Sequence, residues 1–188
     1  MRRIFVGLFA GLIAAALGSG SLPVAASGGS QTIVGIAASN PDFSTLVAAV
    51  SCTGLVPALN GSTRYTVFAP TNEAFAKLGL NASNICTALP KATLTNILLY
   101  HVTNGTRLAN RVLPKGGHRT RTIETLFDDQ SFKVNRAATI FTTSGGMSQI
   151  VATNIRASNG VIHVIDTVLI PGAGSDQEGE QGGDNQSR

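Results

Sequence analysis

The stretch Tyr65–Phe75, YTVFAPTNEAF, constrains the fold of this 188-residue chain more than any other. Its first half alternates in the manner of a β-strand and is rich in β-branched and aromatic residues. Pro70 has no backbone N–H to donate and ends the strand, and Thr71 is a residue type that caps helices. A helix should follow, with Ala74, Phe75 and Leu78 on one side. The stretch therefore predicts a strand, a sharp corner and a short helix.

A second stretch, Asn159–Pro171, begins with an Asn-Gly turn signal and continues as a long β-rich run that a proline ends. Two runs of this kind suggest paired core strands. Between them, Leu98–Val102 (LLYHV) closes a helical pattern and contains the pair Tyr100-His101. In content, order and spacing, the three stretches resemble the fasciclin (FAS1) family. The resemblance extends over residues 31–171.

Helical patterns precede most of the strand patterns along the chain, which indicates an α+β fold and not a βαβ repeat. Helices are expected over residues 32–39, from Pro41 to Gly54 and over residues 91–101. The buried stripes of the last two contain Phe43, Leu46, Val47 and Val50, and Leu94, Ile97, Leu98 and His101. Strands are expected at 120–126, 131–135, 139–141, 150–154 and 161–170. The family resemblance implies a compact β-sandwich or wedge with the N-terminal helices packed on one side.

The chain divides into three regions by composition. Residues 1–26 have a charged start, a short apolar run and a small-residue exit, which are typical of a secretory signal peptide. Residues 27–171 are expected to form a single fasciclin domain, and residues 172–188 a disordered, acidic, Gly-rich tail. No later segment reaches about 18 uninterrupted apolar residues, so we expect no transmembrane segment. The sequence predicts secretion to the extracellular space or the periplasm.

The chain has two cysteines, Cys52 and Cys86. An even number of cysteines in an exported chain favours a disulfide. Neither cysteine has the spacing of a metal site, and we expect neither a metal nor a cofactor.

Positive charge is concentrated in the folded region. Residues 27–170 contain eleven Lys and Arg against six Asp and Glu, a net charge of +5. Much of it belongs to a group that we call the basic cluster: Arg107, Arg111, Lys115, Arg119 and Arg121. Such a run can bind an anionic polymer, for instance a sulfated or uronic polysaccharide, or an acidic membrane surface, although a solvated loop is the commoner explanation. Nucleic acid is the least favoured partner, because a binding motif is lacking and Phe127 is the one aromatic residue nearby.

Catalysis finds little support in the sequence, and we expect no enzymatic activity. Nucleophile-elbow, zinc-protease and nucleotide-binding motifs are absent after the signal peptide. His101 on an apolar helical stripe is typical of a hydrogen-bonded core residue. Asp166 is the single charge in the alternating set from Ile162 to Ile170, so it is expected to be buried and to accept backbone N–H groups near Thr71 and Asn72. We therefore assign structural roles to Thr71, Asn72 and Asp166.

Function is implied by the family resemblance. Fasciclin domains are secreted or surface-held adhesion modules that bind extracellular proteins or matrix. In animal members, the Tyr-His region and an Asp-Ile motif are linked to integrin binding. This chain keeps Tyr100-His101 but has Asn154 before Ile155 at the Asp-Ile position, which argues against integrin-type recognition. The alternative is an extracellular carrier of a small apolar ligand such as a carotenoid, and a hydrolase is a distant third hypothesis.

Overall fold

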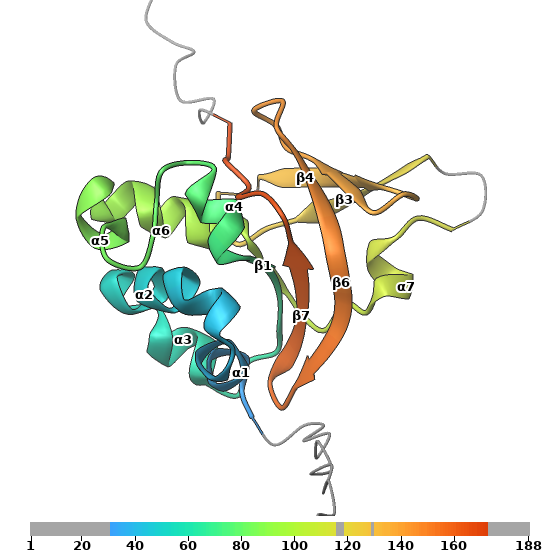
Figure 1. Ribbon diagram of the computed structural model, residues 1–188. Coiled ribbons are helices and arrows are strands. Elements are labelled where there is room, and N and C mark those ends of the chain that lie inside the picture. Colours follow the sequence, from blue (N-terminus) through green and yellow to red (C-terminus); the bar gives the residue numbers. More distant parts are fainter. Residues whose placement is uncertain (1–30, 116–118, 129, 173–188) are drawn as a thin grey trace, which may run out of the picture.

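The computed structural model describes residues 31–115, 119–128 and 130–172 (Figure 1). The predicted signal peptide, His118 and all of the predicted tail except Gly172 lie outside these residues. The helices are α1 (Ile33–Ser39), the 3-10 helix η1 (Pro41–Phe43), α2 (Ser44–Thr53), α3 (Val56–Asn60), α4 (Asn72–Ala76), α5 (Ile85–Ala88), α6 (Lys91–Tyr100) and α7 (Ala109–Val112). The strands are β1 (Tyr65–Pro70), β2 (Val102–Asn104), β3 (Thr120–Glu124), β4 (Ser131–Asn135), β5 (Thr139–Phe141), β6 (Met147–Ala157) and β7 (Gly160–Ile165).

The described strands form a mixed sheet of seven, in the order β2-β1-β7-β6-β5-β4-β3. β1 and β7 are parallel neighbours, with a register that runs from Tyr65 opposite Gly160 to Pro70 opposite Ile165. The remaining neighbours are antiparallel. The two β-rich stretches of the sequence are therefore paired core strands, as predicted.

The two faces of β1 and β7 bury different cores. One face, which includes Val67 and Ile162, packs under the helices. The opposite face carries Phe68 and Ile165, and these pack against residues of β3, β4 and β5 such as Phe132. The rings of Phe68 and Phe132 meet edge to face, with centroids 5.0 Å apart. Figure 1 shows α1 to α6 on one side of β1 and β7 and the strands β3 and β4 on the other. The fold is thus an α+β wedge with helices on one side, which confirms the predicted class.

Local signals place several helix ends. Thr32 accepts a hydrogen bond from the Gly35 N–H (3.2 Å) and caps α1. Gly54 adopts a left-handed conformation with φ 79° and ends α2. Thr71 accepts from the Ala74 N–H at 3.3 Å and caps α4, as expected for a helix that starts after Pro70. The side chain of Asn72 accepts from the Thr45 N–H (3.0 Å) and donates to the Pro41 carbonyl (2.9 Å), so it ties α4 to the start of α2.

Three expectations about boundaries were wrong. α4 ends at Ala76, and Leu78 is 43% exposed, because the chain reverses at Gly79 and buries Leu80 in its place. β7 ends at Ile165, five residues early, because the Gln149 N–H donates to the Asp166 carboxylate (2.8 Å) and the Asp166 carbonyl accepts from Lys77 (2.6 Å), so the β6–β7 ladder stops. β6 runs over Met147–Ala157, well beyond the predicted 150–154, with register shifts that bend it around the wedge. The short elements α3, α7 and β2 were not predicted.

The turn before β7 has a larger structural role than its sequence suggests. The buried Asn159 accepts from the Ile33 N–H at 2.9 Å and donates to the carbonyls of Leu59 (2.7 Å) and Gly61 (3.0 Å). These contacts join the β6–β7 turn to α1 and α3, whose contacting residues lie 98 to 126 positions before Asn159 in the sequence. Asn159 therefore organises this end of the domain.

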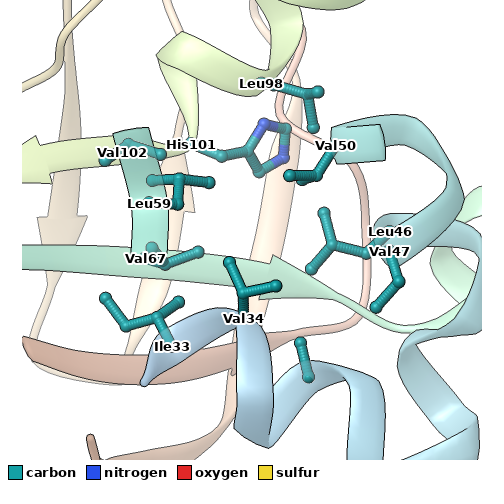
Figure 2. Close-up of a pocket in the computed structure, with 11 residues that line it drawn as sticks. Ile33, Val34, Leu46, Val47, Val50, Leu59, Val67, Leu98, His101 and Val102 are labelled. Carbon is teal, nitrogen blue, oxygen red and sulfur yellow. The ribbon is translucent and has the colours of Figure 1, made fainter. Parts of the chain in front are cut away.

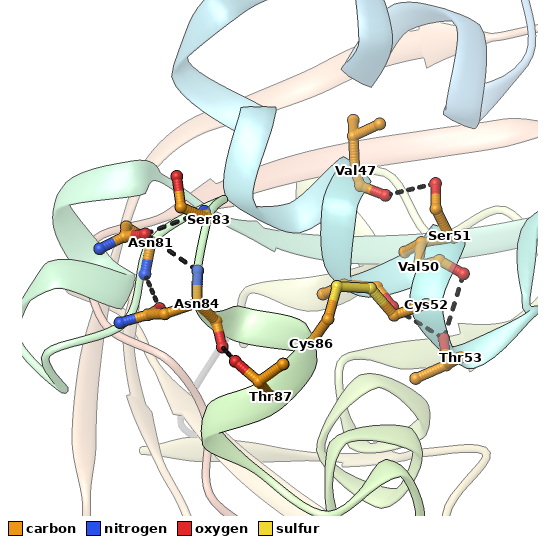
Figure 3. Close-up of a disulfide and its surroundings, with 11 residues drawn as sticks. Val47, Val50, Ser51, Cys52, Thr53, Asn81, Ser83, Asn84, Cys86 and Thr87 are labelled. Atoms are coloured by element: carbon orange, nitrogen blue, oxygen red, sulfur yellow. Dashed lines mark hydrogen bonds between the residues drawn. A yellow bond between two sulfur atoms is a disulfide. The ribbon is translucent and has the colours of Figure 1, made fainter.

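A disulfide joins Cys52 at the end of α2 to Cys86 in α5, with the Cα atoms 5.8 Å apart (Figure 3). The bond closes a loop that contains α3, β1 and α4. The described ranges contain no single helix with the length and apolar character to span a bilayer. Judged by length and composition alone, the bent pair of Ile33–Ser39 with Pro41–Thr53 passes that test together.

Candidate functional site

The pair Tyr100-His101 lies inside the domain. Tyr100 is fully buried, and its hydroxyl donates to the Ser131 carbonyl at 3.0 Å. The His101 ring is 2% exposed. Its Nε2 accepts from the Leu169 N–H at 2.9 Å, so Nδ1 carries the proton and donates to the Ile97 carbonyl at 2.7 Å. The imidazole therefore connects the end of α6 to the chain that follows β7, and neither side chain offers a surface to a macromolecular partner.

Burial lowers the pKa of His101 to about 4, against the smaller effect of the Ile97 carbonyl, which raises it. Protonation of Nε2 would remove the acceptor for the Leu169 N–H and would place a charge among apolar groups. The His101 ring is therefore neutral in the folded state.

Acidification should destabilise the domain through His101. The folded ring titrates near 4 and the unfolded one near 6.5, so the unfolded state binds more protons between these values. The free energy of unfolding therefore falls as the pH falls through this window, by up to about 3 kcal/mol. Urea unfolding at pH 7, 5.5 and 4 should show a shallower pH dependence for His101→Gln than for the unaltered chain. Parallel profiles for the two proteins would contradict this role.

A small apolar cavity adjoins His101 between α1, α2, α3 and β1 (Figure 2). Its volume is about 30 Å³, and side chains such as Ile33, Val50 and Leu98 surround it. Sites for small organic ligands usually measure roughly 300 to 1,000 Å³. A carotenoid would enter this cavity only if α1 and α3 moved away from the sheet.

The Asp166 carboxylate accepts a backbone N–H, as expected, but the donor is on β6 and not at Thr71 or Asn72. Its carboxylate is half-buried beside β6 and accepts from the Gln149 N–H (2.8 Å) and from the hydroxyls of Ser148 (3.2 Å) and Thr167 (3.0 Å). The Thr71 N–H donates instead to the Ile165 carbonyl at 3.3 Å, because β7 ends one residue before Asp166. Partial burial raises the pKa of Asp166, but these hydrogen bonds and the nearby Lys77 outweigh it and hold the pKa below its ordinary value. The expectation of contacts near Thr71 and Asn72 was wrong.

The basic cluster surrounds α7 at the edge of the wedge. Arg111, Lys115 and Arg119 are exposed, and Arg107 and Arg121 are half-exposed. The Arg121 guanidinium donates to the Arg111 carbonyl at 3.0 Å and so ties β3 to α7. The structure therefore brings together residues from two segments on either side of residues 116–118.

Hydrogen bonds with His163 and Asn154 support the loop that carries the cluster. His163 on β7 donates from Nε2 to the Arg107 carbonyl at 2.8 Å, and the Asn154 N–H approaches Nδ1 at 3.4 Å. Burial lowers the pKa of His163, although the Arg107 carbonyl acts in the opposite direction. Asn154 itself has φ 63° and accepts from the Ala109 N–H at 2.8 Å. Asn154 thus positions α7.

Arg64 and Arg156, which the sequence did not associate with the basic cluster, lie beside the loop that carries Arg107. The Arg64 carbonyl accepts from the Gly105 N–H at 2.8 Å. Arg156 is opposite Val161, which is opposite Thr66, so all three side chains share one sheet face. On that face the Thr66 hydroxyl accepts from the Arg107 N–H at 2.7 Å. Because these contacts arise from strand register, no local sequence signal could have revealed them.

The comparisons with known proteins agree with this architecture. The model of the fasciclin domain matches residues 41–171. The chain belongs to the fasciclin family. This fasciclin chain is 40% identical over 151 residues to Protein sll1483 of Synechocystis sp., a match that covers 78% of this chain and 77% of that protein. It is 38% identical over 159 residues to Immunogenic protein MPB70 of Mycobacterium bovis, with 80% and 75% covered.

Longer relatives contain a region similar to this chain. Transforming growth factor-beta-induced protein ig-h3 of Sus scrofa is 35% identical over 147 residues, which are 78% of this chain and 20% of ig-h3. The solved FAS1 domain pair from the insect cell adhesion molecule Fasciclin I superimposes with a TM-score of 0.64 over 76% of this chain and 51% of that one. At 21% identity, this likeness shows the fold alone.

Within the described ranges, no three His, Cys, Asp or Glu side chains are grouped to hold a metal ion. Among the described residues, we therefore take the basic cluster, together with Arg64 and Arg156, as the candidate binding surface.

Proposed function

We propose that this fasciclin domain is a secreted, non-enzymatic adhesion module that binds an anionic extracellular polymer through the basic cluster. The observation that carries the proposal is the gathering of Arg107, Arg111 and Arg121 around α7, with their backbone held by His163, Asn154 and the Arg121 guanidinium. A fixed backbone beneath the cationic side chains reduces the entropy lost when an extended polyanion binds.

A sulfated or uronic polysaccharide suits this surface better than a compact partner does. The cationic side chains extend from β3, α7 and the loop before it, and Arg64 and Arg156 continue the charge toward β6. Charges arranged in this way attract a polyanion over about one Debye length, roughly 10 Å at 0.1 M salt. The proposal also includes the division of the chain into a signal peptide (residues 1–26), a single domain (residues 27–171) and an acidic tail (residues 172–188).

Binding to heparin and to polygalacturonate should depend on the cluster and on salt. We expect the triple variant Arg107→Glu, Arg111→Glu, Arg119→Glu to bind about tenfold or more weakly at low salt, because attraction becomes repulsion. Deletion of everything after Gly172 should strengthen binding, because Asp176, Glu178, Glu180 and Asp184 then no longer compete for the cluster. Surface plasmon resonance at 50 and 500 mM salt measures both effects.

Lys91→Glu, on the exposed start of α6, is the matched control for charge reversal, and dextran is the uncharged control polymer. Equal binding by the parent, the deletion and the cluster variant, independent of salt, would exclude this mechanism. Visible absorption of the purified protein would then test the carrier alternative.

A further inference from the structure

Exposed apolar side chains gather at one place on the side of the wedge. Six large apolar side chains are exposed in the described part of the chain. Four of them lie around the β5–β6 hairpin, the residues after α4 and the chain after β7: Leu78 (43%), Phe141 (36%), Met147 (64%) and Ile170 (43%). Contiguous apolar side chains on a domain surface are typical of a contact with another molecule.

Three of these side chains, Leu78, Met147 and Ile170, line a groove of about 350 Å³. Val168 and Leu169, both buried, form its base. Phe141 is directly opposite Met147 in the β5–β6 pair and so extends the apolar surface beyond the groove. A hollow of this size accepts a large apolar side chain from a partner.

Hydrogen bonds hold the walls of the groove in place. The Ser144 hydroxyl donates to the Ile170 carbonyl at 2.7 Å, and the Gly172 N–H donates to the Thr143 hydroxyl at 3.0 Å. On the other side, the Lys77 ammonium donates to the Asp166 carbonyl (2.6 Å) and to the Thr167 hydroxyl (3.1 Å). The groove is therefore built before any partner arrives, which lowers the entropic cost of binding.

The charges near the groove indicate the chemistry of its partner. Lys77 lies at one side, and Lys133, opposite Phe141 in the β4–β5 pair, lies exposed at the other. The nearby carboxylate of Asp166 already accepts three hydrogen bonds. A second copy of this chain would bring like charges together. The chain's own residues 173–188 are acidic but contain no apolar residue larger than Ala173.

We propose that this groove binds a protein segment in which large apolar side chains are flanked by Asp or Glu. The apolar side chain fills the groove over Val168 and Leu169, and the flanking carboxylates meet Lys77 and Lys133. This surface is separate from the basic cluster and adds a second, protein-binding contact to the domain.

Synthetic 12-residue peptides test the inference with the full mature chain. One has a Leu-Phe centre with Asp and Glu flanks, a second has a Ser-Ser centre with the same flanks, and a third has the Leu-Phe centre with Lys flanks. We expect the first to bind at least about tenfold more tightly than the others, because it supplies both apolar burial and opposite charge. Met147→Ser and Leu78→Ser should each weaken that binding several-fold, and Lys133→Glu should weaken it in a salt-dependent way.

Leu126→Ser is the matched control, because Leu126 is 37% exposed and does not line the groove. Amide shifts in NMR spectra should map the acidic-apolar peptide to residues 142–147 and 167–170. Equal affinity for all three peptides, or binding unchanged by Met147→Ser, would overturn the proposal. Dimerisation that Met147→Ser abolishes would also overturn it in favour of a second copy. Polysaccharide binding should be unaffected by Met147→Ser, which keeps this test independent of the proposed function.

Discussion

Replacement of Gly160 by alanine should lower the free energy of unfolding by about 4 kcal/mol or more, a large part of the roughly 5 to 15 kcal/mol that stabilises a domain. Gly160 begins β7 with φ 155°, a conformation that L-residues with a side chain rarely adopt. A Cβ atom built there would lie 1.9 Å from the Tyr65 carbonyl oxygen and 2.9 Å from the Ile33 side chain. The oxygen belongs to the backbone of β1, so it can move only if the parallel β1–β7 pair separates.

Gly145→Ala provides the matched control for this prediction. Gly145 also has a positive φ, 83°, but no atom lies within 4 Å of its added Cβ. It should cost about 1 kcal/mol, the strain of the backbone conformation alone. Urea unfolding followed by circular dichroism compares the two variants. A Gly160→Ala protein as stable as Gly145→Ala would show that β1 and β7 do not approach each other this closely.

Loss of the Cys52–Cys86 disulfide should lower the free energy of unfolding by about 3 to 4 kcal/mol. The two cysteines are 34 residues apart, and the bond restricts the unfolded chain over that length. It also joins α2 to α5, which is only four residues long. We expect α5 and the segment from Leu78 to Leu89 to lose protection from hydrogen exchange first.

The measurement compares the parent with the double variant Cys52→Ser, Cys86→Ser in urea. Thiol titration of the unfolded parent without reductant should detect no free thiol, and addition of reductant should bring its stability down to that of the double variant. Two titratable thiols in the untreated protein, or equal stability of parent and variant, would contradict the prediction.

Several elements were predictable because their signals are local. The bounds of β4 and β5 agree with the predicted strands 131–135 and 139–141, and α6 follows the predicted stripe closely. Pro70 and Thr71 mark the change from β1 to α4, and Gly54 ends α2. Each signal acts through the backbone of its own neighbourhood, by a missing donor, a capping oxygen or a left-handed φ.

Other boundaries depend on partners distant in sequence. The apolar run continues to Ile170, but the strand ends where the Asp166 carboxylate accepts the Gln149 N–H in place of a backbone carbonyl. Periodicity cannot detect that change, because the alternation of side chains persists while the backbone pairing stops. Helices α3 and α7 span five and four residues, too few for a periodic pattern to be recognised.

By itself, the sequence determined the family, the α+β class, the pairing of its two β-rich stretches and the excess of positive charge, but not that the pair is parallel. All of these depend on residue types and on their order along the chain. Tertiary structure alone decided that Tyr100 is buried, that Arg64 and Arg156 lie beside the loop of the basic cluster, and that Leu78 and Met147 share a groove. The physical reason is that exposure and proximity are set by strand register and layer packing, which join residues up to 126 positions apart.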